Sequence, residues 1–284
     1  MFFRMADKED ARHWQAFVAA SASADFLHDW AWGEVAAFDG QPHRRYLLED
    51  GSRIVAAAAV QVRPMPGGRS FWYVPHGPVL DYADPRAGDW LRAMAGWLTR
   101  TAGLFDLPNA VRLPDTLQVG QTRLVELGSD IELLGGFDKD TRYSVRRAIR
   151  EGVEVWVFDD PADRRPVDDL HALVVETQQR AGFPLPPLER YRVAWRALAG
   201  ARRASILEAR HEGRLLASAM VVILGDRSYY LFSGSRREGE GEPKRYASYA
   251  LQWGMMQLAR QRGAHVHDLW GVSPAGAASD HPWH

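Results

Sequence analysis

Three arginines are spaced so that a helix would bring their side chains onto one face. In the segment TRYSVRRAIR, Arg142, Arg146 and Arg150 lie four residues apart, and the apolar residues between them are left for a core. Guanidinium groups bind phosphate through paired hydrogen bonds, so this stripe could hold a phosphate-bearing substrate. A plain solvated helix face is the alternative. We therefore treat phosphate binding by this stripe as a hypothesis.

A second motif has the spacing of a diphosphate-binding loop. Residues 236–241, RREGEG, fit the pattern Arg-x-x-Gly-x-Gly, in which backbone amides at a helix N-terminus bind the pyrophosphate of coenzyme A. The neighbouring Glu238, Glu240 and Glu242 would repel a diphosphate, and Pro243 has no backbone N–H to donate. We favour a polar loop here and keep a coenzyme A-dependent N-acetyltransferase as an alternative function.

Other common chemistries are excluded or unsupported. The chain has no cysteine, which excludes disulfides, thiolate metal sites and cysteine nucleophiles. It also lacks the Gly-x-Ser-x-Gly motif of serine hydrolases. His265 and His267 alternate along a predicted strand and would share a face, but no third ligand lies near them in the sequence. We therefore expect neither a metal ion nor another cofactor.

The composition indicates a globular protein of two domains. The chain has 284 residues, of which 46% are hydrophobic and 25% are charged. Its formal net charge of −1 excludes nucleic-acid binding through bulk positive charge but does not exclude a local basic patch. The longest strictly apolar run, residues 54–60, is far shorter than the roughly 20 residues of a membrane span. The N-terminal residues hold no secretory signal, so we expect a cytoplasmic protein.

The hydrophobic pattern predicts a similar order of elements in the two halves. In the first half we predict helices at 11–20 and 87–101, and strands at 45–49, 53–62, 71–74, 110–113 and 124–127. In the second half we predict helices at 141–150, 163–181, 187–199 and 245–262, and strands at 204–210, 214–224, 228–232 and 265–269. The last of these helices is apolar on several sides, so we expect it to be buried.

An internal repeat supports two copies of one α/β unit. The segment LLEDGSRIVAAAAVQV is echoed about 160 residues later by LEARHEGRLLASAMVV. Chance similarity between two β-hairpins is the alternative. In each half, helices precede a long antiparallel hairpin, a third strand, a loop and a further helix. This order matches the N-acyltransferase (GNAT-like) unit, so we predict α/β domains with mixed sheets.

Five segments spread along most of the chain carry a more specific resemblance. They are FLHDWAWGEV (26–35), YVPHGPVLD (73–81), KDTRYSVRRAIREGVEV (139–155), YLFSGS (230–235) with YASYALQW (246–253), and HDLWGV (267–272). Together, in this order, they resemble the FemABX family of peptidoglycan-bridge aminoacyltransferases. The chain has no long charged helical insertion, which resembles the FemX type without a coiled-coil arm.

The resemblance implies a fold, a reaction and partners. It implies two tandem GNAT-like domains, which we assign to residues 1–128 and 129–284, and an acyltransferase that uses aminoacyl-tRNA as donor. The amino acid would be added to the side-chain amine of a peptidoglycan stem peptide, which is carried by lipid II or by a UDP-linked muropeptide. We further expect a monomer that associates with the membrane only peripherally, through a lipid-linked substrate. A non-catalytic homologue that only binds the precursor is a second alternative.

The resemblance also implies site residues, carried over position by position. Asp81 and Tyr230 match positions that line the precursor cleft of the family, and Arg190 and Tyr191 fall where the family has a substrate-facing aromatic residue. The full set of expected substrate-binding residues is Trp32, Asp81, Arg190, Tyr191, Tyr230, Tyr246 and Trp270. The stripe Arg142, Arg146 and Arg150 is expected to contact tRNA.

The sequence departs from the family pattern at three places. Ala36 stands where some relatives have a phosphate-binding lysine, and Phe232 replaces a second cleft tyrosine. The family pattern continues after DLWGV to a catalytic Phe-Lys pair, which is expected beyond His284. The general base is therefore open, with Asp81 and Asp115 as candidates.

Overall fold

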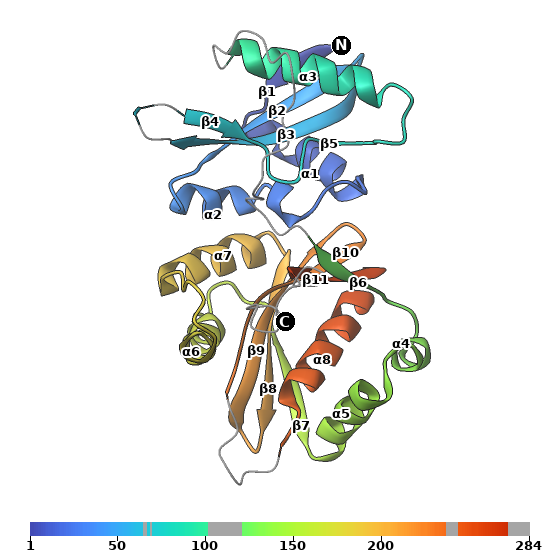
Figure 1. Cartoon of the computed structure of the whole chain (residues 1–284), viewed down its shortest axis with the longest axis vertical. Coiled ribbons are helices and arrows are strands. Elements are labelled where there is room, and N and C mark those ends of the chain that lie inside the picture. The colour runs from blue at the N-terminus through green and yellow to red at the C-terminus, as the bar shows by residue number, and fades with distance from the viewer. Residues whose placement is uncertain (65–66, 69, 102–120, 237–243, 272–284) are drawn as a thin grey trace. The chain divides into compact units, whose positions relative to one another are not determined.

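Two compact α/β units make up the chain. The computed structural model describes residues 1–64, 67–68, 70–101, 121–236 and 244–271 (Figure 1). Contacts between Cα atoms divide the chain into Met1–Gln118 and Val119–His284, and each unit is described by itself below. Within the described part of the chain, every helix is too short or too polar to cross a membrane.

The first unit is built on an antiparallel sheet. Its strands are β1 (Phe2–Met5), β2 (His43–Asp50), β3 (Arg53–Pro64), β4 (Ser70–Tyr73) and β5 (Val79–Leu80). Its helices are α1 (Ala11–Ala20), α2 (Trp32–Phe38) and α3 (Ala87–Thr101), with short 3₁₀ turns η1 (Lys8–Asp10) and η2 (Phe26–His28). The sheet has the order β1-β2-β3-β4, and β5 also pairs with β3.

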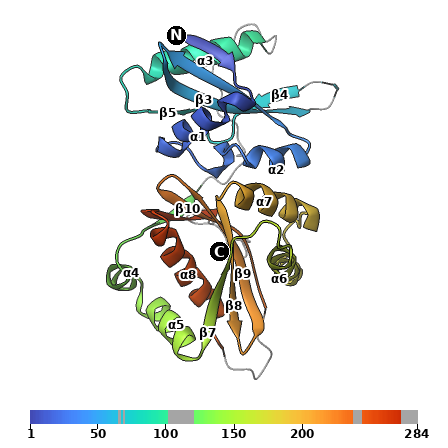
Figure 2. The ribbon, with the colours of Figure 1, turned by 180° about the vertical axis from the view of Figure 1, so that it is seen from behind.

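The predicted hairpin forms the centre of this sheet. Asp50 pairs with Arg53 across a tight turn in which Gly51 has a φ of +63°, a conformation that favours glycine. The following run from Val55 to Val60 is buried at every position, because helices cover both faces of the sheet. Figures 1 and 2 show α3 on one face and α1 on the other. An uninterrupted apolar run is what such a doubly covered strand requires.

The second unit is built on a mixed sheet. Its strands are β6 (Thr122–Glu126), β7 (Val153–Phe158), β8 (Ala204–His211), β9 (Arg214–Leu224), β10 (Arg227–Ser235) and β11 (Val266–Gly271). Its helices are α4 (Asp130–Gly136), α5 (Lys139–Arg150), α6 (Arg165–Ala181), α7 (Leu188–Gly200) and α8 (Ala247–Gln261). The strand order is β6-β11-β10-β9-β8-β7, and the pair β10–β11 is parallel.

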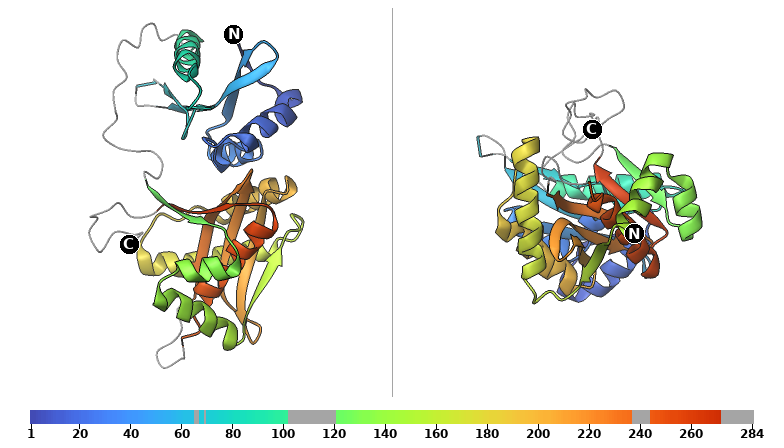
Figure 3. Two further views of the ribbon diagram at one scale, coloured as in Figure 1. Left: turned by 90° about the vertical axis from the view of Figure 1, so that its right-hand side faces the viewer. Right: turned by 90° about the horizontal axis from the view of Figure 1, so that it is seen from below.

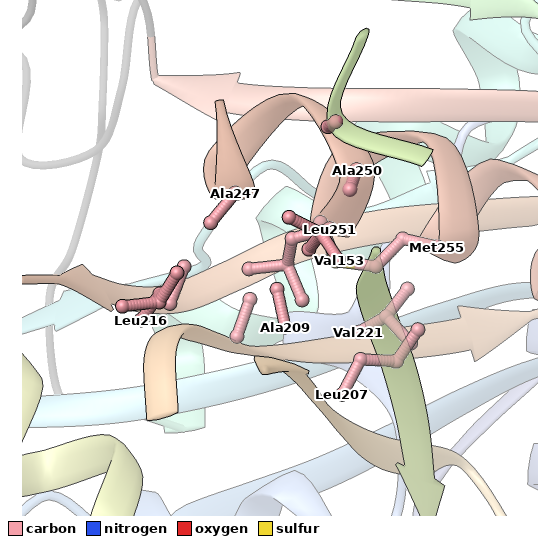
Figure 4. Close-up of a cluster of buried hydrophobic side chains, with 12 residues drawn as sticks. Val153, Leu207, Ala209, Leu216, Val221, Ala247, Ala250, Leu251 and Met255 are labelled. Carbon is pink, nitrogen blue, oxygen red and sulfur yellow. The ribbon is translucent and has the colours of Figure 1, made fainter. Parts of the chain in front are cut away.

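Helix α8 supplies the core on one face of this sheet. Its buried Leu251 and Met255 pack with Leu207, Val221 and neighbouring small residues of β8 and β9, as Figure 4 shows. The predicted burial of this helix is confirmed for most of its length. Among its large apolar residues Tyr249 is an exception, since 42% of its surface is exposed.

Helices α6 and α7 cover the other face (Figure 3). A glycine allows one of them to approach the sheet closely. A Cβ atom at Gly234 of β10 would lie 2.3 Å from the carbonyl carbon of Leu173 and 2.4 Å from the amide nitrogen of Val174. Both atoms belong to the backbone of α6. Only glycine lets this helix lie so close to the strand.

Several elements differ from the sequence predictions. The elements β1, α2, β5, α4 and β7 were not predicted, and the predicted strand 110–113 lies outside the described residues. The predicted strand 124–127 corresponds to β6, which pairs with β11 and so belongs to the second sheet. For this reason we propose a domain boundary ahead of β6. The two predicted strand histidines do not share a face, because His265 is exposed ahead of β11 whereas His267 is buried.

Candidate functional site

In the second unit, the sheet opens where two parallel strands stop pairing. The paired register of β10 and β11 ends at Tyr229 and Asp268, while β10 continues to Ser235 and β11 to Gly271. The register of β10 against β9 also shifts between Tyr230 and Phe232, which marks a bulge. Several of the predicted substrate residues lie at this opening.

The bulge turns two aromatic side chains of β10 to opposite faces. Tyr230 pairs with Val221 and packs against the core beneath α8. Phe232 pairs with Met220 and lies against Tyr191 of α7, with ring centroids 4.6 Å apart. With one extra residue between them, side chains that would otherwise share a face are separated. Tyr191 and Tyr230, each predicted to bind substrate, therefore do not form one patch.

A small aromatic and basic group surrounds Tyr191 on the α7 face. The His171 ring lies 4.9 Å from the Tyr191 ring at an angle of 72°, and the Arg190 guanidinium lies 5.8 Å from the Phe232 ring. Tyr191 itself is only 3% exposed, and burial raises the pKa of its phenol. Arg190, His171 and Phe232 are partly exposed and are therefore more open to a ligand than Tyr191.

Tyr230 and Tyr246 lie near the start of α8. Burial raises the pKa of Tyr230, although hydrogen bonds with Ser233 and Gln252 act in the opposite direction. Tyr246 precedes α8 in a left-handed conformation with a φ of +56°. Its ring lies 5.2 Å from the Arg147 guanidinium. Because burial raises its pKa, the Tyr230 phenol stays neutral and can act as a hydrogen-bond donor to a substrate.

Of the arginine stripe on α5, two members project into solvent. Arg146 and Arg150 are exposed, whereas Arg142 donates hydrogen bonds to the carbonyl groups of Gly135 and Phe137. Those carbonyls lie at the end of α4, where backbone acceptors lack helical partners. Arg142 is therefore engaged in capping the preceding helix, and the exposed pair is what remains for a phosphate.

Trp270, the last residue but one of β11, has a strained conformation. Its φ is +60°, and its backbone amide donates to Asp268 Oδ1 at 2.8 Å. The buried Asp268 also accepts a hydrogen bond from Thr122 of β6. The Trp270 ring meets the Tyr229 ring edge-on at 5.9 Å. A left-handed conformation is costly for a tryptophan and is typical of functional segments.

A hollow of about 910 Å³ lies on the α8 side of the second unit. Its lining comes from β6, α4, α5 and α8, and includes Arg123, Phe137, Gln252, Trp253 and Met256. None of the predicted substrate residues lines it. Gln252 is the link between this hollow and the site, because it also hydrogen-bonds to Tyr230.

In the first unit, the two predicted residues differ in accessibility. Trp32 is 6% exposed and packs edge-on against Phe26 at 4.9 Å, so in this structure it is part of the core. Asp81 follows β5 and is exposed; its Oδ1 accepts a hydrogen bond from the amide of Ala83. The other candidate base, Asp115, lies outside the described residues.

A buried carboxylate between two histidines was not predicted. Asp25, which is 7% exposed, lies 2.5 Å from His76 Nδ1 and 3.2 Å from His28 Nδ1. Burial acts to raise the pKa of Asp25, but the two imidazoles outweigh it and lower this pKa to about 2. His28 is fully buried, and its Nε2 has no hydrogen-bond partner among the described residues.

Further polar groups lie beside this cluster. Burial lowers the pKa of His43 to about 3, with a further contribution from Arg45. Its Nε2 lies 3.0 Å from Gln61 Nε2, and Gln61 Oε1 accepts a hydrogen bond from Arg63. Burying a polar side chain costs free energy unless the side chain is hydrogen-bonded, and such groups gather at functional sites. This network therefore marks a second candidate region for the functional site.

Comparisons with known proteins relate this architecture to acyltransferases. Residues 139–281 match the family model described as "Acetyltransferase (GNAT) domain". The chain is 23% identical, over 298 aligned residues, to the UDP-N-acetylmuramoylpentapeptide-lysine N(6)-alanyltransferase of Weissella viridescens. That alignment covers 94% of this chain and 85% of the relative.

Solved structures share the tandem arrangement of units. The crystal structure of FemX matches with a TM-score of 0.82 at 17% identity, over 99% of this chain and 91% of that one. A tandem GNAT protein from the clavulanic acid biosynthesis pathway matches with a TM-score of 0.50 at 14% identity, over 94% and 88% of the two chains. The predicted fold of two GNAT-like domains and the resemblance to the Fem family are thereby confirmed.

Proposed function

Because this chain belongs to the acetyltransferase (GNAT) domain family, we propose that it is an aminoacyltransferase that acts on a peptidoglycan precursor. It adds an amino acid to the side-chain amine of the stem peptide. The observation that carries the proposal is the similarity along 94% of the chain to an enzyme named for alanyl transfer to the N6 atom of a lysine in a UDP-linked muramoyl pentapeptide. The Fem-like fold of both units supports the same reaction.

The chemistry of this transfer is the aminolysis of an activated ester. The enzyme must hold the two substrates in line and stabilise the oxyanion that develops on the ester carbonyl. The attacking amine must also lose a proton, since its pKa in solution lies near 10. Tyr230 and Tyr246 supply phenol groups near the opening of the second sheet, and Trp270 lies near the end of the neighbouring strand β11. We propose that these residues, with Arg190, contact the substrates.

We propose aminoacyl-tRNA as the acyl donor. Arg146 and Arg150 project from α5 into solvent and are the members of the predicted stripe available to a phosphate backbone. The net charge of −1 means that the affinity for tRNA depends on a few local contacts. Binding is therefore expected to be modest and to weaken steeply with added salt.

The acceptor is proposed to be lipid II or a UDP-linked muropeptide. Asp81 is exposed in the first unit and is proposed to hydrogen-bond to this precursor. A lipid-linked acceptor would bring the protein to the membrane surface peripherally. We propose that it acts in the cytoplasm as a monomer.

A binding experiment separates this proposal from acetyl transfer. Isothermal titration calorimetry of the full chain with a UDP-linked muramoyl pentapeptide is expected to give a measurable Kd, and coenzyme A is expected to give no heat of binding. Micromolar binding of coenzyme A, without binding of the muropeptide, would favour a coenzyme A-dependent N-acetyltransferase. Muropeptide binding without turnover in the presence of charged tRNA would favour the precursor-binding homologue.

A further inference from the structure

The first unit contains a paired carboxylate and imidazole for which the proposed function has so far given no role. We infer that His76 is the general base of the transfer and that Asp25 is its positioning residue. The inference rests on the proposed function and names the group that removes the proton from the acceptor amine. It follows from the contact between these two side chains, their different exposure and the turn that holds His76.

The contact between Asp25 and His76 has the geometry by which a carboxylate orients an imidazole that acts as a base. His76 Nδ1 lies 2.5 Å from Asp25 Oδ2, and the two side chains are 30% and 10% exposed. Asp25 Oδ1 in turn accepts a hydrogen bond from the amide of Leu27 at 2.9 Å, which fixes the carboxylate. With Nδ1–H directed at this carboxylate, the neutral ring presents Nε2 as its proton acceptor. The partly exposed imidazole can thus meet a substrate, while the carboxylate behind it cannot.

The carboxylate keeps its charge at the pH of the reaction. The two imidazoles hold the pKa of Asp25 at about 2 despite its burial. A charged, buried carboxylate stabilises the imidazolium that forms when His76 takes up a proton. It also fixes the tautomer of the neutral ring, so that Nε2 is the unprotonated nitrogen.

The turn around His76 is held in place by close packing. His76 has a φ of +46°, which is uncommon for a residue other than glycine. A Cβ atom at the next residue, Gly77, would lie 2.9 Å from Val74 Cγ1 and 3.1 Å from the buried His28 Nε2. The backbone of the turn therefore lies directly against η2, which ends at His28 and is capped by Asp25. Strained backbone held by its surroundings is a frequent feature of catalytic segments.

Other titratable groups surround this pair and set its electrostatic environment. They are His28 from η2, His43 from β2, Arg63 from β3 and Tyr73 from β4. His28 interacts electrostatically with His43, and Asp25 acts on Tyr73 to raise the pKa of its phenol, to which burial contributes most. Asp81, the other candidate base within the described residues, follows His76 by five positions and accepts a hydrogen bond from Ala83 instead.

The proton transfer and the acyl transfer balance as follows. His76 Nε2 accepts one proton from the ammonium group of the acceptor side chain, which leaves a neutral amine. The amine nitrogen attacks the carbonyl carbon of the aminoacyl ester, so that a C–N bond forms and the C–O bond to the ribose oxygen breaks. A second proton from that nitrogen goes to the leaving ribose oxygen. The imidazolium of His76 then releases the first proton to solvent.

The test measures kcat and KM for amino-acid transfer as a function of pH, on the full chain with a charged tRNA and a UDP-linked muramoyl pentapeptide. His76→Gln keeps a hydrogen-bond donor for Asp25 but cannot accept the proton. It is expected to lower kcat by about 10²–10⁴-fold with a similar KM, and to remove the acidic limb of the pH profile. Added imidazole is expected to restore part of the rate of His76→Ala. His13→Gln, at an exposed position on α1, is the matched control.

Each result decides a different part of the reasoning. If His76→Gln keeps the wild-type rate and acidic limb, or loses only thermal stability, the inference is wrong and the proposed function stands. If the wild-type protein transfers no amino acid with any charged tRNA, the proposed function is wrong and the inference falls with it. Asp25→Asn is expected to shift the acidic limb of the pH profile and to reduce kcat less than His76→Gln does. If Asp25→Asn fails to fold, His76→Gln and His76→Ala still test the inference.

Discussion

Replacing Gly234 by alanine tests how closely α6 lies on β10. The added Cβ would lie 2.3–2.6 Å from three backbone atoms of Leu173 and Val174, where ordinary contact begins near 3.4 Å. Because backbone atoms cannot rotate away, α6 must retreat by about 1 Å, which weakens the packing of its buried face. Overpacking of this kind costs about 1–3 kcal/mol, and we expect a value near 3 kcal/mol.

The assay is thermal unfolding of the full chain, followed by circular dichroism and by differential scanning calorimetry. For a unit the size of Val119–His284, the expected cost lowers Tm by about 6–12 °C. Gly200→Ala is the matched control, since a Cβ at this end of α7 would meet no atom within 4 Å. The control is expected to leave Tm unchanged or to raise it slightly. If the Tm of Gly234→Ala lies within about 1 °C of the wild-type Tm, α6 does not lie this close to β10.

Two further perturbations test the charge distribution. The double variant Arg146→Glu/Arg150→Glu is expected to weaken tRNA binding in a filter assay and to reduce its salt dependence, without a change in Tm. Arg12→Glu/Arg196→Glu, at exposed positions elsewhere, is the control, and equal affinities for the two double variants would leave the stripe a solvated face. Asp25→Asn is expected to remove stability that depends on the carboxylate. Since the folded pKa of about 2 lies below the ordinary 3.8, this contribution of about 2 kcal/mol is present above pH 4 and is lost as the pH falls toward 2. The difference in urea midpoint between wild type and variant should therefore shrink between pH 5 and pH 2, and a constant difference would contradict the charged, buried state.

Local patterns predicted most of the elements. Helix α1 and the hairpin of β2 and β3 were predicted because helical periodicity, and an Asp-Gly turn between apolar runs, both act over a few neighbouring residues. Strand β7 was not predicted; it lies at the edge of its sheet, where Val153 and Val155 pack against the core but Trp156 and Val157 are each 44% exposed. The sheet to which β6 belongs is decided by its pairing with β11, far away in the sequence.

The site was predictable only where side chains are close in sequence. The exposed arginines of α5 follow from helical spacing, but the use of Arg142 as a cap depends on how α4 ends. Nothing in the sequence signals that a bulge in β10 separates Tyr230 from Phe232. The pair Asp25 and His76 is separated by 51 residues and is brought together only by the packing of η2 against the turn after β4. Long-range contacts of this kind carry no local pattern.

Amino-acid transfer to a muropeptide is the reaction on which the proposed function depends. The full chain would be incubated with tRNA charged with isotope-labelled alanine, and in parallel with other charged tRNAs, together with lipid-linked and UDP-linked muropeptides. Tandem mass spectrometry of the product would locate the label. We predict one labelled residue in amide linkage to the side-chain amine of the stem peptide. An unmodified stem peptide with every charged tRNA, together with acetylation of an amine when acetyl coenzyme A is supplied, would contradict aminoacyl transfer.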